Sequence, residues 1–258
     1  MAGFEITAPK VIHCGAGKIL LAAKEIARLG KRAAIVTGKR LHNGELVNNI
    51  KDNLEESGVQ SKFTQPITGE PTVEMVDYLA EQLRAFDADA VLAIGGGSVM
   101  DAAKAAALLV NNDGTAEDYQ LKRKEITAGP IAQVLAPTTA GTGSECTRVS
   151  VLTNTLGGIK RSISHPLMTP DIVILDPHLT VSCNKLLTTL TAMDALAHAI
   201  ESAVSVNSTP YTKHIGLAAC EKISQGLPKC QESPDDLDAR LDCLLGSSFA
   251  GLALQAGL

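Results

Sequence analysis

The sequence is poor in aromatic residues and contains no tryptophan. Its 258 residues include four phenylalanines and three tyrosines, so it offers few rings on which nucleobases could stack. Acidic residues also outnumber basic ones by 28 to 23, and such a balance gives no general affinity for polyanions. We therefore expect no nucleic-acid partner.

Long apolar runs and targeting signals are also missing. The longest apolar run, Ala102–Val110, is interrupted by Lys104 and is shorter than the roughly 18 residues that a membrane-spanning helix needs. The first residues contain no basic segment followed by an apolar one, which a secretory signal would have. These absences predict a cytoplasmic protein without a membrane partner.

The six cysteines form no C-x-x-C pair and follow no regular interval. Without a secretory signal, such cysteines are typical of reduced thiols packed as small apolar side chains. We expect neither a disulfide framework nor a cysteine-zinc site.

Over its first two thirds the sequence alternates β-rich runs with amphipathic helical runs. This alternation predicts a parallel sheet covered by helices, with any ligand at the carboxyl ends of the strands. The predicted strands cover residues 10–13, 32–37, 59–64, 88–94 and 131–136, and the helices 19–30, 45–57, 72–85 and 99–110.

From about Leu179 onward the periodicity is helical only, over residues 186–206, 210–226 and 235–257. We therefore predict an α/β domain over residues 1–178 and an all-α domain over 179–258, with the boundary near Asp176–Pro177. The chain length allows one large domain or two smaller ones.

A glycine-rich turn, Gly95-Gly96-Gly97-Ser98, follows the strongest predicted strand and opens a helix. Glycines let the backbone turn tightly, and the free N–H groups at a helix start favour a phosphate. Met100 stands where the third glycine of the usual dinucleotide fingerprint would be, so the pattern alone indicates only phosphate. The alternative is a capped helix start without a ligand.

Two further stretches carry polar side chains. Residues 137–145 (PTTAGTGSE) follow the predicted strand 131–136 and would add a polar, flexible wall at the same sheet edge, or merely a capped loop. Asp194 and His198 lie four residues apart, on one helix face. Such a pair suits two ligands of iron(II), zinc or manganese, although a simple hydrogen-bonded pair is the alternative. Glu201, one turn further on, would orient the imidazole.

Five stretches together resemble the iron-containing (group III) alcohol dehydrogenase family of the dehydroquinate synthase-like superfamily. They hold in order along the whole chain: GGGSVMD at 95–101 with Lys104 behind it, PTTAGTGSE at 137–145, KRSISHP at 160–166, PDIVILDP at 170–177 and DALAHAIE at 194–201.

The resemblance implies a Rossmann-like parallel-sheet N-terminal domain, a helical metal-binding domain, and a cleft between them. It implies hydride transfer between NAD or NADP and a small primary alcohol or aldehyde, assisted by Fe(II) or Zn(II). We assign no catalytic acid or base, and we expect a homo-oligomer. The residues implied to bind the cofactor are Gly38, Gly95, Gly96, Gly97, Ser98, Asp101, Thr138, Thr139, Thr142, Val149, Val151 and Lys160, and those for the metal are Asp194 and His198.

Gly38-Lys39-Arg40 bears on the choice of cofactor. NAD-preferring relatives often carry an aspartate after this strand to bind the ribose 2′-hydroxyl, whereas this chain carries two cations. Cations favour the 2′-phosphate of NADP. We therefore predict that NADP is accepted.

The resemblance also implies two further histidine ligands, beyond the segment at 251–258. No histidine follows His214 in this sequence, so we expect a truncated member whose helical domain is incomplete and binds metal weakly. In such a chain, apolar helix residues would be exposed and favour self-association. Those we expect to be exposed are Leu241, Leu244, Leu245 and Phe249.

Two other functions stay open. The chain could be a non-catalytic nucleotide-binding remnant of such an enzyme. It could also be a carbon-oxygen lyase like dehydroquinate synthase, although Arg148, Lys160 and Arg161 are few basic residues for a phosphorylated acid substrate.

Overall fold

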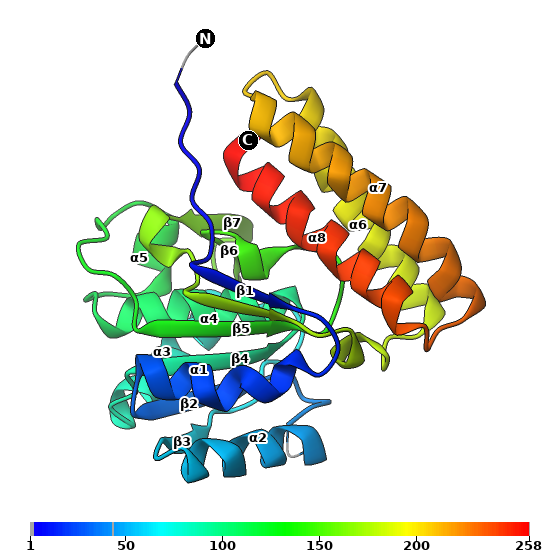
Figure 1. The fold of residues 1–258 in the computed structure, drawn as a ribbon. Helices are drawn as coiled ribbons and strands as arrows, with labels where there is room; N and C mark the ends of the chain where they lie inside the picture. The colour runs from blue at the N-terminus through cyan, green and yellow to red at the C-terminus, as the bar shows by residue number, and fades with distance from the viewer. Residues whose placement is uncertain (1–2, 43, 258) are drawn as a thin grey trace.

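The computed structural model describes residues 3–42 and 44–257, and it places an open sheet beside a group of long helices (Figure 1). Parallel strands form the sheet in the order β1-β8-β5-β4-β2-β3. This confirms the predicted parallel α/β architecture. The sheet strands are β1 (Val11–Cys14), β2 (Arg32–Thr37), β3 (Gln60–Phe63), β4 (Ala90–Gly95), β5 (Ala132–Pro137) and β8 (Ile172–Leu175).

Helices cover both faces of the sheet because alternate strand residues point to opposite sides. Ala33 and Ile35 of β2 belong to the apolar cluster formed with the first two helices, whereas Ala34 and Val36 belong to the cluster formed with the next three. The result is a three-layer sandwich. The helices are α1 (Ala22–Leu29) and α2 (Glu45–Glu56) on one face, and α3 (Val73–Ala85), α4 (Gly97–Val110) and α5 (Ala116–Gln120) on the other.

The carboxyl ends of the central strands meet in register. Thr37 at the end of β2 pairs with Ile94, and Gly95 at the end of β4 pairs with Pro137 at the end of β5. The loops that follow these three strands therefore start side by side. An antiparallel hairpin of β6 (Val149–Asn154) and β7 (Ile159–Ser164) stands beside them.

Three long helices follow the sheet: α6 (Lys185–Val204), α7 (Pro210–Glu232) and α8 (Leu237–Gly257). Helix α7 runs six residues past the predicted end at Gly226 and contains Pro228. Proline removes one backbone donor and disfavours a helix interior, but here it lies in the last turns, where packing on α8 maintains the helix.

The predicted exposure of the apolar side chains of α8 is wrong. Leu244 is completely buried, and Leu241, Leu245 and Phe249 are partly buried. The reason is that α8 is the inner helix: it packs on both α6 and α7 and also touches β8 and two short 3-10 helices. Helix α6 carries the exposed apolar side chains instead, namely Leu186, Leu190, Met193, Ile200 and Val204.

None of the helices in the described ranges is both long and apolar enough to cross a membrane. The predicted domain boundary at 178/179 falls within the 3-10 helix η4 (Pro177–Thr180), between the sheet and the three long helices. The division into two domains stays a prediction.

Candidate functional site

Two hollows adjoin at the carboxyl ends of the strands, on either side of the turn Gly95–Ser98. The Gly38 pocket, of about 760 Å³, is lined by the loops after β2, β3, β4 and β5. The Asp194 pocket, of about 660 Å³, is lined by the turn, the β6–β7 hairpin and residues of α6 and α8. Every residue that the sequence nominated for cofactor or metal lines one of the two. Gly38, Gly95, Gly96, Thr138 and Thr139 line the first, and Gly97, Ser98, Asp101, Thr142, Val149, Val151, Lys160, Asp194 and His198 line the second.

The glycine turn lies between the two pockets, at the start of α4. Gly96 is the N-cap residue of this helix and provides no side-chain cap. A Cβ on Gly97 would lie 2.7 Å from the side chain of Thr142. Gly96 and Gly97 thus add no side chain of their own where the helix presents its free N–H groups, and the Thr142 side chain occupies the space beside Gly97.

The loop 138–143 forms the opposite wall, and its glycines have a structural role that the sequence did not indicate. A Cβ on Gly141 would lie 2.9 Å from Thr191 of α6, and one on Gly143 would lie 2.5 Å from the carbonyl oxygen of Ser247 in α8. Gly143 also has a φ of 60°. These glycines let the loop pack tightly on the long helices, and the flexibility of the wall stays a prediction.

Asp101 lines the Asp194 pocket, but its carboxylate is already engaged by the protein. Oδ1 accepts a hydrogen bond from Ser144 Oγ at 2.5 Å, and Oδ2 accepts one from Val151 N at 3.1 Å. Asp101 thereby connects α4 to the start of β6. Val149 and Val151 of that strand face the pocket.

Lys160 in β7 reaches the rim of the Asp194 pocket and pairs there with Glu70, with 2.8 Å between Nζ and Oε1. Hydrogen bonding by Lys160 lowers the pKa of the Glu70 carboxyl. Both side chains are more than half exposed, so this ion pair is worth little energy and opens easily. Sequence reasoning missed Glu70, because this residue follows a turn glycine and belongs to no motif.

Asp194 and His198 project from α6 into the same pocket. Asp194 Oδ1 lies 3.7 Å from His198 Nε2, and 49% of the aspartate side chain is exposed against 23% of the histidine. Nδ1 of His198 is buried without a hydrogen-bond partner, so the predicted orientation of the imidazole by Glu201 is wrong. The pair thus presents one oxygen and one nitrogen donor toward the pocket.

Other candidate donors lie elsewhere. His178 bonds through Nδ1 to Asp176, and His214 bonds through Nδ1 to the carbonyl oxygen of Pro210. Within residues 3–42 and 44–257, no group of three or more His, Cys, Asp or Glu side chains is arranged to hold a metal ion.

Two family models match the chain. The model described as iron-containing alcohol dehydrogenase matches residues 9–177, and the model for the C-terminal part of that family matches residues 188–257. The chain belongs to the iron-containing alcohol dehydrogenase family.

Comparison with individual proteins supports this assignment to the alcohol dehydrogenase family. The chain is 36% identical over 253 residues to the probable alcohol dehydrogenase EutG of Escherichia coli, covering 97% of this chain and 64% of that relative. It is 35% identical to long-chain-alcohol dehydrogenase 1 of Geobacillus thermodenitrificans, covering 98% and 64%. The solved sulfoacetaldehyde reductase from Bifidobacterium kashiwanohense, in complex with NAD+, has a TM-score of 0.93 at 31% identity over 100% of this chain and 68% of that one. The chain thus spans 64% of the length of the two curated relatives.

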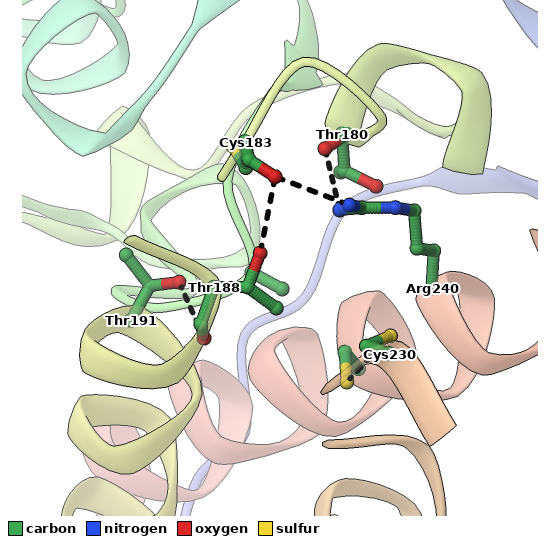
Figure 2. Close-up of a pocket in the computed structure, with 8 residues that line it drawn as sticks. Thr180, Cys183, Thr188, Thr191, Cys230 and Arg240 are labelled. Carbon is green, nitrogen blue, oxygen red and sulfur yellow. Dashed lines mark hydrogen bonds between the residues drawn. The ribbon is translucent and has the colours of Figure 1, made fainter. Parts of the chain in front are cut away.

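A buried arginine supports the far wall of the Gly38 pocket in this family member. Figure 2 shows the Arg240 guanidinium directed at the carbonyl oxygens of Thr180 and Cys183, at 2.5 and 3.2 Å. Cys183 lines the Gly38 pocket, and its thiol donates to the carbonyl oxygen of Thr138 at 3.2 Å. The sequence did not nominate Arg240, because one arginine in a helical run gives no sign of burial.

The cysteines are unpaired thiols, as predicted, and four of the six are buried. Cys230 and Cys243 line the same small cavity as Arg240, with 3.9 Å between the two sulfur atoms. Cys183 is the one that reaches the candidate site, a position that its pattern in the sequence did not reveal.

Two buried charged groups lie behind the Asp194 pocket. Glu145 accepts a hydrogen bond from Ser248 Oγ of α8 at 2.7 Å, and burial raises the pKa of its carboxyl. Burial also lowers the pKa of the Lys104 ammonium, although the nearby Asp101 opposes this shift. Burying an ionised side chain costs free energy unless it is hydrogen-bonded. Glu145 and Lys104 therefore need their hydrogen-bond partners, and those partners belong to the elements that form the site.

Proposed function

We propose that this chain transfers hydride between NAD or NADP and a small primary alcohol or its aldehyde, with help from a divalent metal, Fe(II) or Zn(II). The observation that carries the proposal is that the glycine turn of α4 and the Asp194–His198 pair line one pocket. A bound nucleotide and a bound metal would then lie in the same pocket. When bound, the metal would act as a Lewis acid on the alcohol or aldehyde oxygen.

The residues around the turn fit a dinucleotide. Bare N–H groups at the start of the 14-residue helix α4 favour the pyrophosphate. Gly96, Gly97 and Ser98 would bind it, because the two glycines add no side chain of their own and the side chains of Thr139 and Thr142 lie next to them. The remaining predicted contacts, to the ribose and nicotinamide, would come from Thr138, Thr139, Thr142, Val149, Val151 and Lys160, which line the two pockets.

Asp194 and His198 fit the first two ligands of a divalent metal. One carboxylate oxygen and one imidazole nitrogen, 3.7 Å apart, make a mixed donor set. Such a set suits Fe(II) or Zn(II) rather than calcium, which prefers oxygen alone. By themselves these two residues would hold a divalent metal weakly.

The test measures binding and turnover separately. Purified chain would be titrated with NADH and NADPH by nicotinamide fluorescence, loaded with Fe(II) or Zn(II), and then assayed with primary alcohols by the absorbance of the reduced nicotinamide. We expect His198→Ala to lower metal affinity at least about tenfold and to leave cofactor affinity unchanged. His214→Ala, which changes an exposed histidine on α7, is the matched control. Failure of the wild-type chain to bind either cofactor would contradict the proposal.

A second function, nucleotide binding without turnover, is favoured by the donor set, since the described residues offer two metal ligands rather than three or four. Cofactor binding with no oxidation of alcohol at saturating metal would support it. The lyase alternative gains no support from the three relatives, of which two are named alcohol dehydrogenases and one a sulfoacetaldehyde reductase.

We further propose that NADP is accepted in the Gly38 pocket. Lys39 and Arg40 are exposed, line this pocket and make no ion pair among the described residues, so both are available to a 2′-phosphate. Replacing both by alanine should weaken NADPH binding about 10- to 100-fold, the equivalent of one or two charge-assisted hydrogen bonds. Affinity for NADH should change little.

The matched control is Lys122→Ala with Arg123→Ala, which removes two cations from an exposed loop outside both pockets. Equal losses of NADH and NADPH affinity in the Lys39/Arg40 variant would contradict a 2′-phosphate contact.

Three expectations stay proposals. Residues 1–178 would bind the nucleotide and 179–258 would supply the metal ligands as separate domains. The protein would be a homo-oligomer and would act in the cytoplasm.

A further inference from the structure

Lys104 is the one ammonium placed inside the described core: none of its side chain is exposed. It lies in α4, one turn after Asp101, and its Nζ is 3.3 Å from Asp101 Oδ1. Nζ also donates to the carbonyl oxygen of Ser144 at 2.8 Å and to Thr147 Oγ1 at 3.1 Å. A further hydrogen bond goes to the carbonyl oxygen of Val149.

These acceptors do not belong to α4. They belong to the turn Ser144–Val149, which leaves the loop 138–143 and enters β6. The first four residues of the turn, 144–147, are buried, so this part of its backbone has little access to water. A buried carbonyl without a donor is costly. Lys104 therefore determines which way the backbone of this turn points.

Asp101 and Lys104 hold the two ends of that segment from one face of α4. Asp101 accepts hydrogen bonds from the hydroxyl of Ser144 and from Val151 N, and its carbonyl oxygen accepts one from Ser150 Oγ at 2.8 Å. Side chains one turn apart on a helix lie together. The Lys104 ammonium donates hydrogen bonds to carbonyl oxygens of the segment. The Asp101 carboxylate accepts hydrogen bonds from a hydroxyl and an N–H group of the same segment.

The segment connects the candidate site to the long helices. Val149 and Val151 form part of the Asp194 pocket. Glu145 accepts a hydrogen bond from Ser248 of α8, and Arg148 N donates to Gln255 Oε1 of the same helix at 2.9 Å. A change in the turn would thus move the pocket wall and its support on α8 together.

We propose that Lys104 is a positioning residue for the nucleotide site. It holds the turn Ser144–Val149 so that Val149 and Val151 keep their place in the pocket wall against the glycine turn. It does not touch the nucleotide itself. The effect on cofactor affinity rests on the proposed function, whereas the effect on the turn does not.

The test compares Lys104→Met with the wild type in two measurements. Methionine keeps an unbranched apolar stem and removes the donors. Amide hydrogen exchange of the chain without cofactor should rise about tenfold or more over residues 144–151, as expected when a bond from a charged donor is lost. The dissociation constant for NADH or NADPH, from nicotinamide fluorescence, should rise by a similar factor.

Asn112→Ala is the matched control. Asn112 is also buried and also fixes a loop, but it lies just after the other end of α4, where it donates to the carbonyl oxygen of Ala128 and accepts from the backbone N–H of Thr127. It should destabilise the fold and leave cofactor affinity and exchange at 144–151 unchanged. If Lys104→Met does not fold, Thr147→Val takes its place, because it removes one acceptor of the ammonium. It should raise both the amide exchange over 144–151 and the cofactor dissociation constant, by smaller factors.

Unchanged exchange over 144–151 in a folded Lys104→Met chain would overturn the role of Lys104, whatever happens to cofactor binding. So would a loss of cofactor affinity equal to that of Asn112→Ala. A wild-type chain that binds neither cofactor would instead overturn the proposed function, and the exchange measurement would then decide the role of Lys104.

Discussion

Replacing Gly143 by alanine is expected to lower the free energy of unfolding by about 3 kcal/mol, the sum of left-handed backbone strain and overpacking. Gly143 has a φ of 60°. A Cβ there would lie 2.5 Å from the carbonyl oxygen of Ser247 and 2.8 Å from the Cα of Gly251. Both neighbours are backbone of α8 and cannot rotate away, so the loop would have to separate from the helix. Urea unfolding measures the loss.

Gly158→Ala separates strain from contact. Gly158 has nearly the same φ, 61°, but a Cβ there meets nothing within 4 Å. This substitution should lower the free energy of unfolding by the backbone strain alone, about 1 kcal/mol. If Gly143→Ala lost no more than Gly158→Ala, close packing of the loop on α8 would not be what requires glycine.

Arg240→Leu should lower the free energy of unfolding by about 3 kcal/mol, because several buried carbonyls lose their donor together. Arg240 is 3% exposed, and its guanidinium serves the carbonyl oxygens of Pro234, Thr180 and Cys183. Pro234 lies between α7 and α8, Thr180 ends η4, and Cys183 lies between η4 and α6. Thermal unfolding measures the loss, and a weaker affinity for cofactor should accompany it through Cys183.

Arg28→Leu is the matched control, since Arg28 makes an ion pair with Glu25 while 66% of its side chain is exposed. Its loss should stay below about 1 kcal/mol. A change of the same small size in Arg240→Leu would mean that packing of the leucine replaces everything the guanidinium contributes.

Much of the sheet could be predicted from the sequence. Residues 33–36 and 90–94 are unbroken apolar runs, and they form most of the buried central strands β2 and β4. The hairpin β6–β7 was not predicted as such, because its strands follow one another without an apolar run and Lys160 and Arg161 interrupt the second. The end of α7 was misplaced because Pro228 is a helix breaker in most contexts.

The sequence predicts the site residues that directly follow a strand. It does not predict those whose place depends on packing between elements. The glycine turn stands directly after β4, so its place at the sheet edge follows from the strand. The burial of Lys104 and Arg240 does not follow, because lysine and arginine are usually exposed. Likewise, the inward orientation of α8 depends on α6 and α7, which periodicity within one helix does not describe.

The edge position of β1 has a consequence for how the chain folds. In the described sheet β1 pairs with β8 alone, and the contact between Lys10 and Asp171 at its start joins residues 161 positions apart. Loop closure over such a distance costs entropy that local pairs avoid. During synthesis the first strand must therefore wait until β8 has been made, while β2, β3 and β4 can already assemble. The strand that is synthesised first is thus among the last to join the sheet.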